Sequence, residues 1–62
     1  MQRYFAQIIN NKILLDDGDV HHLLNVMRMK KGDQIEVVAD EKLYVCGIKE
    51  TNPLDIEVIE IA

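Results

Sequence analysis

The sequence predicts a mainly β domain with one short helix, folded as a small barrel. The chain has 62 residues, the size of one domain, and nearly half of them are apolar. Branched and aromatic residues gather in several short runs that turn residues separate, as in strands joined by tight turns. Only one segment, Val20–Arg28, has apolar residues at the spacing of a helix. We therefore expect a single domain over residues 1–62.

Two strands are predicted before the helix. Arg3–Ile9 is rich in aromatic and branched residues, and Asn10-Asn11 then marks a turn. Lys12–Leu15 is a second short extended run, which Asp16-Asp17-Gly18 ends. Asp19 follows as the predicted N-cap, because its carboxylate is able to accept hydrogen bonds from the first backbone amides of a helix.

The helix predicted over Val20–Arg28 has two contrasting sides. The apolar side, which we expect to face the core, consists of Val20, Leu23, Leu24 and Met27. On the other side, three polar residues lie within an arc of about 60° that contains no acidic residue: His21, Asn25 and Arg28. His22 is expected to be partly packed and His21 to face solvent. Gly32 suits a left-handed residue in the turn that follows.

Three strands are predicted after the helix. Gln34–Ala39 alternates apolar and polar residues, and Asp40-Glu41 connects it tightly to a strand over Lys42–Ile48. A loop with Pro53 precedes the last strand, Asp55–Ile61. These short connections require antiparallel pairing, since a parallel crossover needs a longer segment.

Charge is distributed unevenly along the chain. The net charge of −4 argues against a polyanionic partner. Up to Gly32, however, five cations stand against three acids, a net of +2, whereas the remainder has two cations against eight acids, a net of −6. Such a bipolar chain is able to present one face to a polyanion and turn the other away.

Several function classes find no support in the sequence. No apolar run approaches the roughly 18 residues of a membrane span, and the N-terminus has no secretory signal, so we expect a cytoplasmic protein without a membrane partner. His21-His22 lacks the four-residue spacing of helical zinc ligands. Neither a glycine-rich phosphate loop nor a nucleophile with its base is recognisable. We expect no metal, cofactor or catalytic site in these residues, and a buried structural thiol at Cys46.

Basic and aromatic residues near the helix suggest RNA binding. Arg28, Lys30 and Lys31 form a run whose charges also suit the negative end of the helix dipole, which is a purely structural role. The acid-free arc adds further donors and favours phosphate binding. Tyr4 and Phe5 are able to stack on unpaired bases. The alternative is that Phe5 belongs to the core and Tyr4 is half-buried.

Two stretches resemble a known family. The chain opens with Met1-Gln2-Arg3-Tyr4-Phe5. The second stretch has a His-His pair, a Val-x-Arg-Met core and a Gly-Asp turn in one unbroken order: His21-His22-Leu23-Leu24-Asn25-Val26-Met27-Arg28-Met29-Lys30-Lys31-Gly32-Asp33. Together the two stretches resemble the N-terminal part of the RsmE family of rRNA methyltransferases.

The resemblance implies a parent enzyme with two domains. Its N-terminal PUA-like barrel binds RNA, and a SPOUT domain with a trefoil knot binds S-adenosylmethionine and forms the homodimer. The family methylates N3 of a uridine in the 16S rRNA of the small ribosomal subunit. The present residues correspond to the barrel alone, so no cofactor or catalytic residue is carried over, and the barrel by itself is expected to be monomeric. The RNA-site residues implied by the family's motif positions are Arg3, His21, His22, Asn25 and Arg28.

Two other function classes stay open. The barrel is also suited to docking against its own catalytic domain through the acidic, apolar later strands. An isolated enzyme is the third class. An electropositive face combining Arg3, Arg28 and Lys31 would favour RNA, whereas scattered cations would favour docking.

Overall fold

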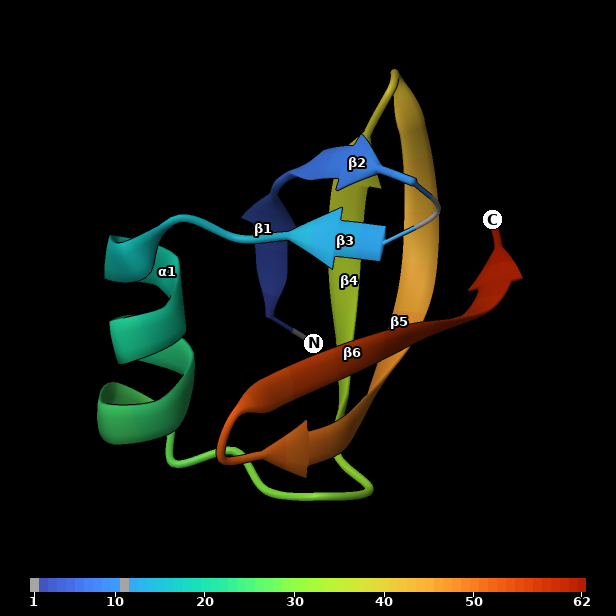
Figure 1. Cartoon of the computed structure of the whole chain (residues 1–62). Coiled ribbons are helices and arrows are strands. Elements are labelled where there is room, and N and C mark those ends of the chain that lie inside the picture. Colours follow the sequence, from blue (N-terminus) through green and yellow to red (C-terminus); the bar gives the residue numbers. More distant parts are fainter. Residues whose placement is uncertain (1, 11) are drawn as a thin grey trace.

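A computed structural model describes residues 2–10 and 12–62 of the chain (Figure 1). It contains six strands and one helical segment, whose first half is α-helical and whose second half is π-helical. In chain order the elements are β1 (Arg3–Phe5), β2 (Gln7–Ile9), β3 (Lys12–Leu14), α1 (Asp17–His21), η1 (His22–Val26), β4 (Gln34–Ala39), β5 (Lys42–Thr51) and β6 (Leu54–Ile61). The prediction of a mainly β domain with one short helix is confirmed.

Four strands form one sheet in the order β1-β4-β5-β6, and β2 and β3 form a separate hairpin. The pairing of β4, β5 and β6 is antiparallel, as predicted from their short connections. β1 pairs with β4 in parallel, because the hairpin and the helix together supply a long crossover between them. The hairpin contacts the sheet where β3 meets β6, and in Figure 1 it lies between the helix and β5. The two layers enclose the interior of a small barrel.

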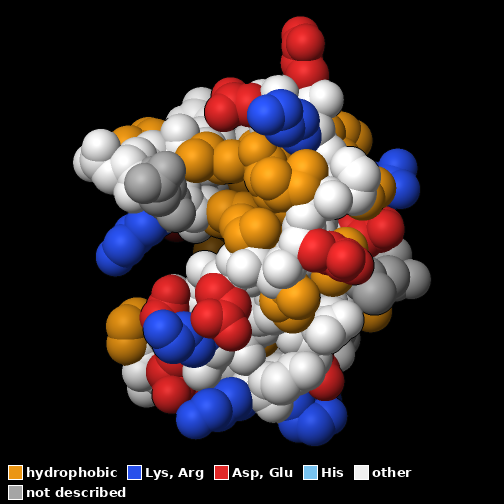
Figure 2. Space-filling model, turned by 90° about the vertical axis from the view of Figure 1, so that its right-hand side faces the viewer, with side chains coloured by type: hydrophobic (Ala, Val, Ile, Leu, Met, Phe, Trp, Pro, Cys, Tyr) orange, Lys and Arg blue, Asp and Glu red, His pale blue; other side chains and the backbone are white. Residues whose placement is uncertain are grey.

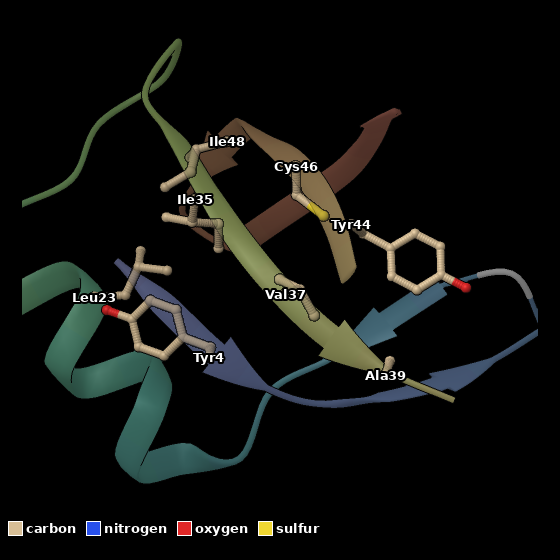
Figure 3. Packing of buried hydrophobic residues seen from close by; sticks show 8 residues of the cluster. All are labelled: Tyr4, Leu23, Ile35, Val37, Ala39, Tyr44, Cys46 and Ile48. Carbon is tan, nitrogen blue, oxygen red and sulfur yellow. The ribbon is translucent and has the colours of Figure 1, made fainter. Parts of the chain in front are cut away.

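The core consists of side chains that the inner face of the sheet and the helix bury together. Its members are Tyr4, Leu23, Ile35, Val37, Ala39, Tyr44, Cys46 and Ile48 (Figure 3). Alternation along β4 places Ile35, Val37 and Ala39 on the inner face. The prediction that Cys46 is a buried structural thiol is confirmed, since the residue is fully buried and unpaired.

The helix begins earlier than the sequence predicted. Asp16, not Asp19, is the N-cap, and its carboxylate accepts a hydrogen bond from the Asp19 backbone N–H at 2.7 Å. The prediction was wrong because it started the helix at the first apolar residue of the periodic pattern. The first turn faces solvent, so it carries no such residue.

The apolar side of the helix is only partly buried. Leu23 is fully buried, Val20 and Leu24 are half-buried, and Met27 is exposed. Met27 departs from the prediction because the turn before it is π-helical. A widened turn changes the direction in which the following residues point.

The first predicted strand is also divided. Arg3–Ile9 forms two strands, because the chain leaves β4 at Ala6 and pairs with β3 from Gln7 onwards. Within β1, Tyr4 points into the core and is 5% exposed, whereas Phe5 points away and is 72% exposed. The alternative that placed Phe5 in the core and left Tyr4 half-buried is therefore wrong.

Three turns agree with their sequence signals. Asp40 and Glu41 connect β4 to β5, both with positive φ, and Gly32 has a φ of 96°. Asn10 has a positive φ, while Asn11 of the predicted Asn10-Asn11 turn lies outside the described residues. None of the helices in the described part of the chain has the length and apolar character needed to cross a membrane.

Candidate nucleic-acid interface

A part-buried hydrogen-bonded pair joins β1 to the helix. The Tyr4 hydroxyl lies 3.0 Å from Nδ1 of His22, and the two rings pack edge to face with centroids 5.9 Å apart. In Figure 3 the Tyr4 hydroxyl is directed at the helix, beside Leu23. His22 is half-buried, as predicted. The Tyr4 ring is not exposed enough to stack on a base, so that expectation is wrong. Strand alternation turns Tyr4 inward.

His21 and Asn25 lie together on the solvent side of the helix, as predicted. The Asn25 side-chain amide is 3.3 Å from Nδ1 of His21, and both residues are exposed. Their four-residue separation makes them neighbours on the helix surface. Each retains further hydrogen-bonding capacity for a ligand.

The helix ends in an unusual turn that positions Arg28. The Met27 N–H donates to the His22 carbonyl at 2.8 Å, a π-type hydrogen bond, and Met29 N–H donates to the Leu23 carbonyl at 3.0 Å. Between them Arg28 has a φ of 51°, in the left-handed region that glycine usually occupies after a helix. Arg28 is exposed and lies two residues past Val26, the last residue of the helix, whose predicted range included Arg28. π turns and left-handed non-glycine residues are both enriched at functional sites.

The run after Arg28 is fixed by Asp33. Its carboxylate accepts from Lys30 N–H at 2.9 Å and lies 3.8 Å from Lys30 Nζ. Gly32 N–H donates to the Ile48 carbonyl at 2.9 Å, which ties the turn to β5. Lys31 is exposed and belongs to no ion pair among the described residues. Lys31 therefore keeps its charge available, whereas that of Lys30 is partly neutralised.

Arg3 stands apart from the other candidate residues. Its guanidinium lies 3.4 Å from the Glu36 carboxylate, its register partner on β4. Alternation in β1 places Arg3 on the face opposite Tyr4, whose hydroxyl reaches the helix. The structure therefore brings together the helix-borne candidates His21, His22 and Asn25 but leaves Arg3 on the other face, so Arg3 does not join Arg28 and Lys31 in one electropositive face.

Comparison with known proteins decides the family. A family model described as the RNA methyltransferase PUA domain matches residues 15–61. The chain belongs to this family. The match contains the helix, the Arg28 turn and the three long strands, and it confirms the PUA-like barrel that the resemblance implied.

Two relatives give the scale of the similarity. The chain is 44% identical to the ribosomal RNA small subunit methyltransferase E of Bacillus subtilis (strain 168), over 56% of this chain and 16% of that protein. A crystal structure of a hypothetical protein superposes with a TM-score of 0.84 at 28% identity, over 98% of this chain and 29% of the other. This PUA domain therefore spans less than a third of either relative.

The PUA domain also has two open grooves. One, of about 390 Å³, lies between residues 5–7 and 14–16. The other, of about 450 Å³, lies between residues 12–15, Val20 and residues 53–56. Neither is lined by the helix-borne donors, which lie on open surface. In the described part of the chain, no three His, Cys, Asp or Glu side chains are close enough to hold a metal ion.

Sequence reasoning missed two contacts of this interface. The Tyr4–His22 pair joins residues 18 positions apart, and the Gln2 side-chain amide lies 3.2 Å from the Met27 sulfur, across 25 positions. Neither contact leaves a local sequence signal. Both depend on the parallel pairing of β1 with β4, which places the start of the chain beside the helix.

Proposed function

We propose that this PUA domain binds the RNA substrate of a methyltransferase, the 16S rRNA of the small ribosomal subunit. The observation that carries the proposal is a group of exposed or half-buried hydrogen-bond donors on the helix and in the turn after it, in a chain that belongs to an RNA methyltransferase PUA family. This group consists of His21, His22, Asn25, Arg28 and Lys31; we call it the helix-end group. Lys30 supports it, and Arg3 contributes at most from the opposite face.

Arg28 is the centre of the proposed interface. Its guanidinium is able to hold a phosphate through two hydrogen bonds or to stack on a base, and lysine reproduces neither geometry. The left-handed turn carries the side chain past the last helical residue, so it projects from a fixed backbone. His21 and Asn25 add neutral donors and acceptors of the kind that read base edges or 2′-hydroxyls.

The charge distribution predicts that this domain contributes only modestly to the affinity of the parent protein for RNA. Arg3 and Lys30 each have an acidic partner, and the chain as a whole is acidic. Counterion release therefore involves few cations, and affinity should fall only gently with salt. The domain is better suited to orienting an RNA that the rest of the enzyme also holds.

We assign the methyl-transfer reaction to the part of the parent protein outside these residues. We propose a cytoplasmic, S-adenosylmethionine-dependent enzyme that methylates N3 of a uridine and dimerises outside these residues. The 62-residue chain should then be a monomer that neither binds the cofactor nor transfers methyl groups. Calorimetry with S-adenosylmethionine and sedimentation at micromolar concentration test these two expectations.

The proposal is tested by comparing two charge removals. Arg28→Ala should weaken binding of small-subunit rRNA fragments by about 1–3 kcal/mol. Lys49→Ala removes an exposed cation on β5 and should leave binding nearly unchanged. The titration uses the chain alone and joined to the rest of the parent protein. Equal weakening by both variants would assign the effect to net charge and contradict the interface.

Docking onto the parent's catalytic domain is a second candidate function, and the outer face of the sheet favours it. Phe5, Val38 and Leu43 align across β1, β4 and β5 on this face, away from the core. A side chain at Gly47 would meet Ile59 at 3.0 Å, which places Ile59 on the same face. An apolar sheet face of this kind is usually covered.

The two candidate surfaces do not exclude each other, because Phe5, Val38 and Leu43 lie on the outer face of the sheet and the helix packs on its inner face. Figure 2 shows that hydrophobic side chains reach the surface on the side of the molecule where β5 lies, with acidic and basic ones around them, and no histidine is visible there. The helix lies on the opposite side in Figure 1. Phe5→Ser should loosen the domain in the parent protein, as measured by limited proteolysis, while Ile9→Ser on β2 should not. Equal proteolysis of the two variants would remove the docking candidate.

A further inference from the structure

The hydrogen bond between Tyr4 and His22 does more than satisfy a polar group in the core. We propose that the Tyr4 hydroxyl donates a hydrogen bond to Nδ1 of His22 and so fixes the neutral imidazole with its proton on Nε2, the nitrogen left to bind RNA. Tyr4 is then a positioning residue for His22. The RNA part of this inference rests on the proposed function, whereas the protonation pattern does not.

The direction of the hydrogen bond follows from the surroundings of Tyr4. Tyr4 is 5% exposed, and a buried hydroxyl proton needs an acceptor. Nδ1 of His22, at 3.0 Å, is the partner that the Tyr4 hydroxyl has among the described residues. If Nδ1 donated instead, the phenolic proton would be left without an acceptor.

A second observation keeps the proton on Tyr4. Burial raises the pKa of the Tyr4 phenol, and the nearby negative charge of Asp19 raises it further. The hydroxyl therefore remains a donor throughout the physiological range. A neutral imidazole that accepts at one nitrogen carries its proton on the other.

The packing fixes the ring as well as the proton. The Tyr4 and His22 rings meet edge to face at an interplanar angle of 65°, and Tyr4 is held in β1 by pairing with Val37. His22 is the first residue of the π turn, and its carbonyl accepts the Met27 N–H. Ring and backbone are thus both constrained. His22 is half-buried, so part of the residue is open to solvent, and the proposal requires that Nε2 lies in that part.

The protonation pattern is tested without RNA. Nitrogen-15 NMR of the wild-type chain at neutral pH should show a pyridine-like Nδ1 and a pyrrole-like Nε2 for His22. Tyr4→Phe, which keeps the ring, should convert this to a mixture of the two neutral forms. His21 is the internal control, because its signals should not change. A pyrrole-like Nδ1, or an unchanged His22 in Tyr4→Phe, would overturn the inference.

The role in RNA binding is tested by a double-mutant cycle. Tyr4→Phe should weaken binding of a small-subunit rRNA fragment by about twofold to tenfold in wild type and have no effect in a His22→Ala background. Equal weakening in both backgrounds would overturn the positioning role, even with the NMR result as expected. If Arg28→Ala and Tyr4→Phe both leave RNA binding unchanged, the proposed function fails too.

Discussion

The Asp16 carboxylate accepts the Asp19 backbone N–H at 2.7 Å and thereby starts the only helical segment in the described chain. Capping of this kind contributes about 0.5–2 kcal/mol. Asp16→Ala should lower the free energy of unfolding by that amount in urea denaturation. Asp17→Ala removes a neighbouring exposed carboxylate that caps nothing and is the matched control. Equal effects of the two substitutions would show that charge near the helix dipole, and not the cap, stabilises the helix.

Leu23 is the residue through which the helix packs on the sheet. It is fully buried, and Leu23→Ala should cost about 2–5 kcal/mol of unfolding free energy. Val26, on the same helix, is 59% exposed, so Val26→Ala should cost well under 1 kcal/mol by comparison. A small loss for Leu23→Ala would mean that the helix is peripheral to the barrel.

Much of the fold was predictable from local patterns. Gln34–Ala39 has the predicted bounds because its alternation and its Asp40-Glu41 turn are both strong signals. The division of Arg3–Ile9 was not predictable, because it depends on β1 pairing with a strand more than 30 positions later. The π turn also left no signal. His21, His22 and Asn25 could be placed near one another by spacing alone, but Tyr4's inward direction could not.

Replacing Arg28 should weaken RNA binding without lowering the stability of the fold. Its left-handed conformation costs a non-glycine residue roughly 1–2 kcal/mol. Arg28→Gly should therefore leave the unfolding free energy unchanged or raise it by up to about 1 kcal/mol, while it weakens RNA binding as strongly as Arg28→Ala. Thermal unfolding and RNA titration of the same samples test both statements. A clear loss of stability in Arg28→Gly would indicate that the side chain has a structural role.

Alkaline pH should destabilise the fold through two buried groups. Burial raises the pKa of the Cys46 thiol above 9.0 and that of the Tyr4 phenol above 10.0. The folded chain thus holds these two protons to higher pH than the unfolded chain does, so their contribution to stability is fully present below about pH 9 and is lost as pH rises beyond it. Urea denaturation across this range should show the fall beginning later in Cys46→Ala. An identical pH profile for wild type and Cys46→Ala would contradict the assignment to Cys46.

Cations at the end of the helix are proposed to contact RNA, and the salt dependence of binding tests this proposal. The measurement compares binding of small-subunit rRNA fragments by the wild-type parent protein and by its double variant Arg28→Ala, Lys31→Ala. We expect the double variant to bind more weakly at low salt. We also expect a smaller slope of log affinity against log salt, by roughly one unit for each phosphate that is no longer neutralised. Equal affinity and equal slope for the two proteins would contradict the proposed interface.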